Sequence, residues 1–353
     1  MNKEINIPSL LKIGSGKISK IGKYLSDRNF VKAAIFFSDG IENIVADKLY
    51  PGLNNFSIEI VHKDIISDIN IENATNTAFK IPSGTNVLLG IGGGKALDYS
   101  KYCAHILNLP FISIPTSVSN DGFCSPNASL LVSGKRKSIK STIPYGVVAD
   151  IDVISNAPLI SLYSGIGDTI SKITALWDWK QAFVKGFEDF NDFAGLMSHN
   201  SLDIIYESKN LNINDKEFKY KMVNSLVLSG IAMEIAGYSR PASGSEHLIS
   251  HALDSVTKSP KMHGLQVGIA TYLCSLLQNN NSEDIKNFLL KTGFFDFIKA
   301  SPINKNDFIE ALKLAPSIKQ NYYTILSEQD SLEKALNFIN TDKILSTYCL
   351  TNN

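Results

Sequence analysis

The stretch VLLGIGGGKALDYSKYCAHIL, residues 87–107, decides the fold of this chain. It reads as a buried strand, a turn of three glycines (Gly92, Gly93 and Gly94) and a helix that begins near Lys95. Glycine lets a backbone approach a phosphate closely, and the first turn of a helix offers unpaired N–H groups at the positive end of its dipole. We therefore predict that the turn binds the pyrophosphate of a dinucleotide, with a purely structural tight turn as the alternative.

Three more apolar runs accompany that strand in the first half of the chain. They are AAIFF at 33–37, FISI at 111–114 and VVADI at 147–151. None of them alternates with a period of two, which is typical of parallel strands that helices cover on both faces. This pattern predicts a doubly wound, Rossmann-like parallel sheet.

Helical spacing replaces strand-like runs from about Leu159 onward. Residues 220–238 and 330–348 are clear examples of it. We predict an α/β domain over residues 1–160 that binds the dinucleotide. A helical bundle domain over residues 161–353 is expected to bind metal and substrate.

Composition narrows the class of protein. The chain has 353 residues, of which 44% are apolar and 19% charged, and its formal net charge is zero. The basic residues form no stripe, so a small molecule is a better partner than nucleic acid.

The first residues lack a signal-like apolar segment, and no apolar run approaches the ~20 residues of a membrane span. Without any CxxC pair, the cysteines indicate a reducing compartment, so we expect a cytoplasmic protein without a membrane partner. We expect the four to be buried or incidental: Cys103, Cys124, Cys274 and Cys349.

Polar side chains follow two of the predicted strands. The loop PTSVSNDGFCSPNAS, residues 115–129, comes directly after FISI. Ligands of an open parallel sheet bind beyond the carboxyl ends of its strands, so this loop is expected to share a crevice with the glycine turn. Its candidate cofactor contacts are Thr116, Ser117, Ser119 and Ser125. Asp121 could reach a substrate hydroxyl, although a polar loop that caps the next element is also compatible with the pattern.

Asp39 ends the strand that contains AAIFF. A carboxylate at that point can accept a hydrogen bond from a ribose hydroxyl and disfavour a 2′-phosphate. The pair Asp39-Gly40 is equally an ordinary turn signal. Both interpretations stay open at this stage.

Three of the six histidines lie within residues 243–268: His247, His251 and His263. The first two are four residues apart on a predicted helix and share a face, and a Ser-Pro pair precedes a second helix that begins near His263. The HxxxH spacing is that of a zincin, but Leu248 stands where a metalloprotease needs its glutamate base. Two neighbouring helices can therefore aim imidazoles at one metal ion, in a protein that is not a peptidase.

A divalent site with two imidazoles normally includes a carboxylate and an open position. The candidate carboxylate is Asp168, in the segment SGIGDTISK at the start of the first bundle helix. An Asp before a Thr could equally be a simple helix N-cap. The residue pattern alone does not say which two of the three imidazoles bind the metal.

Five motifs in order, GGGKALD, PTSVSNDGFCSP, GIGDTISK, SGSEHLISHALD and MHGLQVG, give this chain a family resemblance. Across residues 80–270 it resembles the superfamily of iron-containing alcohol dehydrogenases and dehydroquinate synthases, most closely the sn-glycerol-1-phosphate dehydrogenases. The resemblance implies NAD or NADP on the glycine turn and one divalent metal held by one aspartate and two histidines. Matched motif by motif, it gives Asp168, His247 and His263 as metal ligands, with Asp121 and His251 as substrate contacts. The implied cofactor contacts are Gly94, Lys95, Ala96, Leu97, Asp98, Thr116, Ser117, Val118, Ser119 and Ser125.

The activity that the resemblance implies is the reversible, NAD(P)H-linked reduction of dihydroxyacetone phosphate to sn-glycerol 1-phosphate, in phospholipid biosynthesis. We expect zinc as the metal, with nickel or iron as alternatives, and a homo-oligomer. One departure is Asn120 before Asp121-Gly122, where family members often have histidine, so the polar contacts beside the substrate can differ. The basic segment 134–140 is a hairpin, a flap or a solvated loop, and its Arg136, Lys137 and Lys140 are candidates for binding the substrate phosphate.

Three other functions are alternatives. A glycerol dehydrogenase has the same fold and metal but takes an uncharged substrate, dihydroxyacetone in the reverse direction. A dehydroquinate synthase-like lyase resembles this chain less, because its usual glutamate ligand is Asp168 here. The third alternative is a catalytically silent NAD-binding or structural protein, which retention of all three ligands and Asp121 disfavours.

Overall fold

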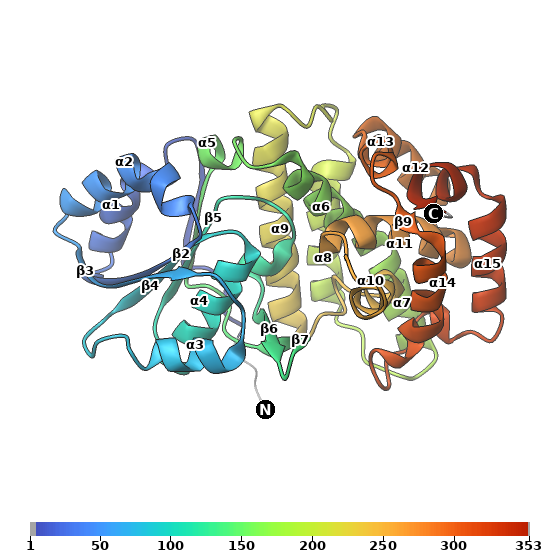
Figure 1. The fold of residues 1–353 in the computed structure, drawn as a ribbon, viewed down its shortest axis with the longest axis horizontal. Coiled ribbons are helices and arrows are strands. Elements are labelled where there is room, and N and C mark those ends of the chain that lie inside the picture. The colour runs from blue at the N-terminus through green and yellow to red at the C-terminus, as the bar shows by residue number, and fades with distance from the viewer. Residues whose placement is uncertain (1–4, 352–353) are drawn as a thin grey trace. The chain divides into compact units, whose positions relative to one another are not determined.

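The computed structural model describes residues 5–351 (Figure 1). The chain divides into two compact units. The first contains the chain up to Pro158 together with Asn214–Glu234, and the second contains Leu159–Ile213 and the chain from Ile235 onward. The segment Asn214–Glu234 lies beyond the boundary near residue 160 that the sequence predicted. The dinucleotide-binding and metal-binding roles of the two parts stay predictions.

The first unit is built on a six-stranded sheet in which every neighbouring pair is parallel. Its spatial order is β1-β8-β5-β4-β2-β3. The strands are β1 (Leu10–Gly14), β2 (Lys32–Ser38), β3 (Glu59–Ile66), β4 (Val87–Gly92), β5 (Phe111–Pro115) and β8 (Gly146–Asp150). The four apolar runs form the four inner strands, so the predicted doubly wound parallel sheet is confirmed, and β1 and β3 are additional strands at its edges.

Helices cover both faces of this sheet, as the inner strand β2 illustrates. Ile35 lies in one core cluster with Val45 of α2 (Ile41–Asn54), whereas Phe36 lies in another with Tyr99 of α4 (Gly94–Ile106). Figure 1 shows α1 (Ile21–Ser26) and α2 on one side of the strands, and α3 (Ile71–Ala78) and α4 on the other. Both faces are buried, which explains why the inner strands read as continuous apolar runs.

A β-hairpin and two further helices complete the first unit. The strands β6 (Asn127–Val132) and β7 (Lys135–Lys140) pair antiparallel around Ser133 and Gly134, whose φ angles are 51° and 73°. Two consecutive positive φ angles match the twist of a two-residue hairpin turn, so the basic segment is a hairpin. The two helices are α5 (Ile151–Ile154) and α9 (Lys216–Ala236), the latter lying in this unit up to Glu234.

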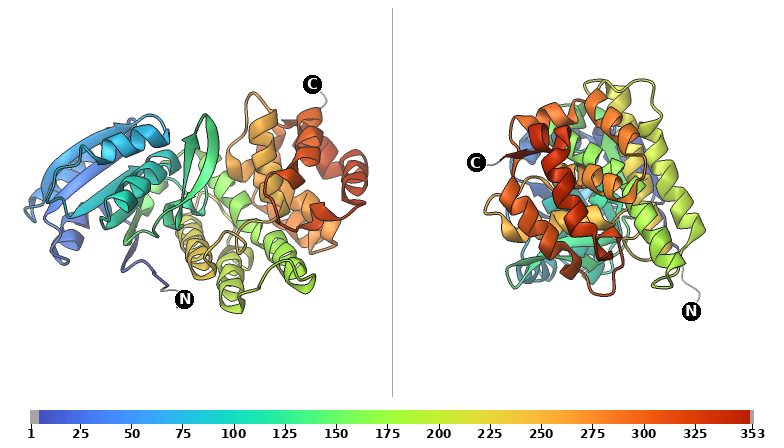
Figure 2. Two further views of the ribbon diagram at one scale, coloured as in Figure 1. Left: turned by 90° about the horizontal axis from the view of Figure 1, so that it is seen from below. Right: turned by 90° about the vertical axis from the view of Figure 1, so that its right-hand side faces the viewer.

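In its described residues, the second unit is helical apart from one short parallel pair of strands, β9 (Ile303–Asn304) with β10 (Leu350–Thr351) (Figure 2). Its helices are α6 (Leu159–Ile170), α7 (Lys172–Val184), α8 (Asp192–Tyr206), α10 (Ser245–Val256), α11 (His263–Gln278), α12 (Ser282–Lys291), α13 (Phe294–Lys299), α14 (Lys305–Leu314) and α15 (Ser331–Thr341). Short helical turns occupy Ala315–Ser317, Ile325–Ser327 and Leu345–Cys349 in this unit, and Ile18–Lys20 and Asp121–Cys124 in the first. The predicted helical bundle is therefore present.

Each of the four cysteines is buried and carries a free thiol. Between residues 5 and 351, no helix combines the length and the hydropathy that a bilayer crossing requires.

Candidate functional site

The glycine turn has room for a ligand above the first turn of α4. Gly92 has a φ of +153°, and a Cβ there would lie 2.1 Å from Ser38 Oγ, so this position requires glycine. Among residues 5–351, a Cβ on Gly93 would meet only Ser117 Oγ, at 3.9 Å, and one on Gly94 would meet nothing within 4 Å. The N-terminus of a 13-residue helix thus faces open space, and a pyrophosphate fits such a cradle.

The polar segments predicted to bind the cofactor follow adjacent strands of the sheet. Asp39 follows β2, the glycine turn follows β4 and Thr116 follows β5, in the spatial order β5-β4-β2. The Thr116 N–H donates to the Gly92 carbonyl at 3.0 Å, which ties two of these turns together. Asp39 is exposed and can accept a hydrogen bond from a ligand.

The other predicted cofactor residues differ in accessibility. Lys95 is exposed, but Ala96 lies in the core between α4 and the sheet, where only its backbone can serve a ligand. Asp98 is buried and pairs with Lys101 at 3.5 Å. Leu97, Val118 and Ser125 are also buried, while Ser117 and Ser119 are partly exposed.

Asp121 opens the short helical turn Asp121–Cys124, and its carboxylate has a partner that the sequence did not reveal. Ser229 Oγ on α9 donates to Asp121 Oδ2 at 2.6 Å, although 108 residues separate the two. A Cβ on the next residue, Gly230, would lie 2.5 Å from the Cys124 carbonyl, so glycine lets α9 approach this turn. A Ser-Gly pair inside an apolar helix is the only trace of this contact in the sequence.

Lys101 also anchors the turn Asp121–Cys124. Its ammonium, completely buried, donates to the Gly122 carbonyl at 2.5 Å and to the Asn127 carbonyl at 2.7 Å. Burial lowers the pKa of Lys101, whereas the neighbouring Asp98 carboxylate counteracts that shift. The loop around Asp121 is therefore fixed by buried contacts on two sides.

Asp168, His247 and His263 come together in the second unit. One ligand atom from each lies within 4.8 Å of the other two, and His247 Nε2 is 3.6 Å from Asp168 Oδ1. Asp168 lies in the last turn of α6, His247 in the first turn of α10, and His263 begins α11. Asp168 was expected at the start of its helix, but the run from Leu159 to Ile170 stays helical through two glycines, which excludes an N-cap role.

Two glycines beside the cluster allow α6 and α11 to touch. A Cβ on Gly167 would lie 1.9 Å from the Gly264 carbonyl, and one on Gly264 would lie 1.8 Å from the Ser164 carbonyl. Each glycine is the chain neighbour of a cluster member, Asp168 or His263. The close approach of the two backbones therefore sets the distance between those side chains.

Buried charges surround Asp168. The Lys172 ammonium donates to the Asp168 carbonyl at 2.6 Å and lies 3.4 Å from its Oδ2, with no part of the lysine side chain exposed. Burial raises the pKa of the Asp168 carboxyl, but Lys172 and His247 outweigh burial and hold that pKa well below its usual range. The Asp168 carboxyl is thus ionised at neutral pH.

Glu246 sets the orientation of His247. Its Oε1 lies 2.8 Å from His247 Nδ1 and 2.6 Å from the Gly244 amide, and its Oε2 accepts from Thr174 Oγ1 at 2.7 Å. Burial lowers the pKa of His247, but Asp168 and Glu246 raise it above its ordinary value overall. With Nδ1 held by a carboxylate, Nε2 faces Asp168, which is the arrangement that metal-binding histidines usually have.

The third histidine of the cluster has a different position. The His251 ring stacks on the His263 ring with 5.5 Å between centroids and 25° between planes. His251 is not one of the three residues whose ligand atoms converge. It lies beside the cluster, where a substrate contact is feasible.

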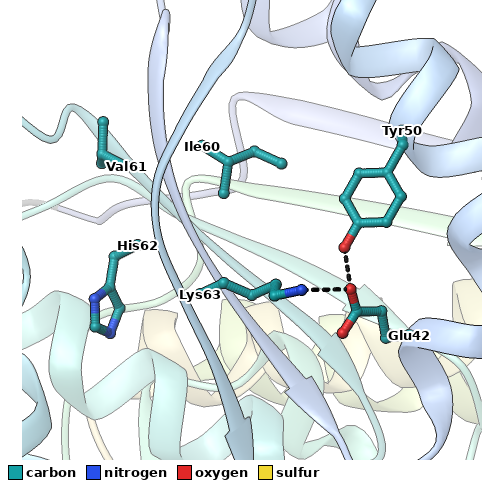
Figure 3. Close-up of a pocket in the computed structure, with 6 residues that line it drawn as sticks. All are labelled: Glu42, Tyr50, Ile60, Val61, His62 and Lys63. Atoms are coloured by element: carbon teal, nitrogen blue, oxygen red, sulfur yellow. Dashed lines mark hydrogen bonds and ion pairs between the residues drawn. The ribbon is translucent and has the colours of Figure 1, made fainter.

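A surface pocket of about 460 Å³ in the first unit involves none of the predicted site residues (Figure 3). It lies beside the edge strand β3, and its lining includes Ile60, Val61 and His62. Glu42 accepts hydrogen bonds from Tyr50 and Lys63 there, the latter at 2.8 Å. These charges already satisfy one another, so the pocket does not compete with the glycine turn or the histidine cluster as a candidate site.

Comparison with known proteins adds evidence independent of this geometry. Residues 12–158 match the family model of iron-containing alcohol dehydrogenases. A glycerol-1-phosphate dehydrogenase (NAD(P)+) from Metallosphaera sedula is 35% identical over 92% of this chain and 93% of its own length. Its counterpart from Pyrococcus furiosus is 41% identical over 70% of this chain and 72% of its own. The solved structure of glycerol dehydrogenase from Schizosaccharomyces pombe has the same fold, with a TM-score of 0.76, 19% identity and coverage of 98% and 92%.

Proposed function

This chain belongs to the family of glycerol-1-phosphate dehydrogenases, and from that premise we propose that it reduces dihydroxyacetone phosphate to sn-glycerol 1-phosphate. The reaction is a reversible hydride transfer from NADH or NADPH that requires a divalent metal. The observation that carries the metal-dependent part is the convergence of Asp168, His247 and His263 within 4.8 Å.

The donor set fits a catalytic divalent cation. Two imidazole nitrogens and one carboxylate leave a fourth position for substrate, as in catalytic zinc sites, and zinc is the metal we propose. A cation held there supplies Lewis-acid polarisation of a carbonyl oxygen. Lys172 keeps Asp168 ionised and Glu246 keeps His247 Nε2 directed at the cluster, so the chain prepares the site before any ligand binds.

The remaining roles fall to residues that move protons or bind substrate. We propose that Asp121 accepts a hydrogen bond from a substrate hydroxyl, with its carboxylate oriented by Ser229. His251, stacked on His263, is the candidate to deliver the proton that converts the developing alkoxide to an alcohol.

The glycine turn is the proposed site of the cofactor pyrophosphate, because the space above Gly93 and Gly94 is open. Asp39, exposed at the end of β2, accepts from the adenine-side ribose in this proposal and favours NAD over NADP. The substrate phosphate would meet Arg136, Lys137 or Lys140 of the hairpin, all of which are exposed. Arg136 is partly engaged, because its Nε donates to Ser129 Oγ at 2.8 Å.

The cellular setting completes the proposal. Four free, buried thiols suit a reducing cytoplasm, and we propose that the enzyme works there as a homo-oligomer.

The decisive experiment compares two ketones. NADH oxidation is followed with dihydroxyacetone phosphate and with dihydroxyacetone, before and after thorough metal removal, and again after Zn²⁺ is restored. We expect a preference for the phosphorylated ketone, loss of activity on chelation and recovery with Zn²⁺. A preference for dihydroxyacetone would indicate a glycerol dehydrogenase, and activity that survives metal removal would contradict the mechanism.

A further inference from the structure

A chain of buried hydrogen bonds leads away from His263 into the second unit. His263 Nδ1 lies 3.0 Å from Ser250 Oγ on α10, and Ser250 Oγ lies 2.9 Å from Gln266 Oε1 on α11. Ser250 is fully buried and Gln266 is 1% exposed, so water does not compete for these contacts. The direction of each hydrogen bond can be deduced from the Gln266 end of this series of hydrogen bonds.

The far end fixes the orientation of the Gln266 amide. Gln266 Nε2 lies 3.2 Å from Asp254 Oδ1 and 3.1 Å from the Lys261 carbonyl. Both partners are acceptors, so the nitrogen of the amide must face them and donate. The amide oxygen, Oε1, therefore faces Ser250.

That orientation determines where the Ser250 hydrogen goes. A serine hydroxyl has one hydrogen, and an amide oxygen has none, so Ser250 donates to Gln266 Oε1. Ser250 Oγ can then only accept from His263, which places a hydrogen on Nδ1. In a neutral imidazole the other nitrogen, Nε2, is consequently unprotonated.

We propose that Ser250 and Gln266 are positioning residues that fix His263 in its Nδ1–H tautomer, so that Nε2 is the atom that binds the divalent cation. This inference rests on the metal centre of the proposed function. The opposite tautomer would direct an N–H at the cation and prevent ligation. Glu246 achieves the same orientation at His247 with a charged acceptor, whereas Ser250 and Gln266 do so without adding charge.

The tautomer can be measured in the metal-free protein. Nitrogen NMR on protein labelled in its histidine rings, with the His263 signals assigned by substitution, reports which ring nitrogen carries the hydrogen. We expect Nδ1–H for His263 in the unmodified protein. In Ser250→Ala we expect a shift toward Nε2–H and a loss of Zn²⁺ affinity of about 10- to 100-fold, measured by competition with a chelator.

Two further variants separate this role from simple packing. Ser250→Thr keeps the hydroxyl and should restore both the tautomer and the affinity. Gln266→Met removes the acceptor that directs the Ser250 hydrogen, and it should also release the tautomer, which gives a second test if Ser250→Ala folds poorly. Ser275→Ala is the matched control, because that buried hydroxyl on α11 donates only to the Tyr272 carbonyl, at 2.7 Å.

The outcomes distinguish the two levels of the proposal. An Nε2–H tautomer in the unmodified protein would overturn the inference, as would a Ser250→Ala variant that behaves like Ser275→Ala in both measurements. A failure of the unmodified protein to bind Zn²⁺ would instead contradict the proposed metal centre, and the NMR result would still decide the tautomer.

Discussion

Ser229 and Asp121, 108 residues apart, share a hydrogen bond of 2.6 Å between a helix hydroxyl and a carboxylate oxygen. The contact lies in the first unit and gives Asp121 Oδ2 a fixed partner. Because Asp121 is the proposed substrate contact, its orientation should influence turnover.

Replacing Ser229 by alanine tests this relationship. A hydrogen bond to a charged group contributes about 1.5–3 kcal/mol, so we expect kcat/KM for dihydroxyacetone phosphate to fall by about tenfold or more. Ser225→Ala is the control, one turn earlier on α9, because its buried hydroxyl has no hydrogen-bond partner among residues 5–351. Equal losses in the two variants would show that the effect is one of helix packing.

Removing the buried ammonium beside Asp168 should destabilise the metal-free protein. In Lys172→Met the Asp168 carboxylate keeps its burial but loses its closest cation, and breaking a buried pair costs about 3–5 kcal/mol. Urea unfolding measures this loss, and Zn²⁺ should recover part of it by binding the folded state. The exposed pair Lys334–Asp330 provides the control, since Lys334→Met should cost about 1 kcal/mol or less.

Asp178 should make the folded protein less stable as the pH rises. Burial and the neighbouring Glu246 raise the pKa of Asp178 to about 7, far above its value of about 3.9 in an unfolded chain. Between those values the folded state binds more protons than the unfolded state, so raising the pH from 4 to 7 lowers the free energy of unfolding, by about 4 kcal/mol at most. Asp178→Asn should abolish this contribution in urea titrations across that range. The same slope in both proteins would contradict the assignment.

Two neighbouring glycines should respond differently to alanine. Gly94→Ala adds a methyl group to open space above the turn, so the melting temperature should stay unchanged while KM for NADH rises about tenfold, or ~1.4 kcal/mol of binding. Gly92→Ala forces a Cβ against Ser38 at a positive φ and should cost about 1–3 kcal/mol of stability. If Gly94→Ala bound NADH normally, the cofactor would not occupy this turn.

The hairpin lysines should matter only for a phosphorylated substrate. Lys137→Gln and Lys140→Gln remove charge without changing the apolar face, and we expect either or both to raise KM for dihydroxyacetone phosphate about tenfold. KM for dihydroxyacetone should not change, and Lys135→Gln, at the turn end of the same strand, should affect neither ketone. Parallel changes for the two ketones would rule out a phosphate contact here.

The inner strands of the sheet could be predicted because burial on both faces leaves a continuous apolar run. The outer strand β3 could not be predicted, because its sequence EIVHKDII includes Glu59 and Lys63 in exposed positions and Asp64 in a partly exposed one. An edge strand pairs on one side only and tolerates polar residues. A search for continuous apolar runs therefore misses strands at the solvent-exposed edge of the sheet.

The histidine cluster was visible in the sequence, but its supporting residues were not. The three histidines were conspicuous as scarce residues close together, and Asp168 was the candidate carboxylate. The family resemblance favoured that role for Asp168 over an N-cap. No sequence motif marks the supporting residues Lys172, Ser250 and Gln266. Their roles depend on how α6, α10 and α11 pack together. Only the glycines Gly167 and Gly264, next to two of the proposed ligands, gave a sign of that packing.

Helix α9 also constrains how the molecule is made. The first unit takes residues from two separate parts of the chain, and the second of these ends at Glu234. The sheet can therefore assemble early during synthesis. Asp121 gains its hydrogen-bond partner only later, because Ser229 leaves the ribosome after more than a hundred further residues have been added. A gene fragment that stops near residue 160 would encode the whole parallel sheet but lack the helix against which the proposed substrate-binding turn packs.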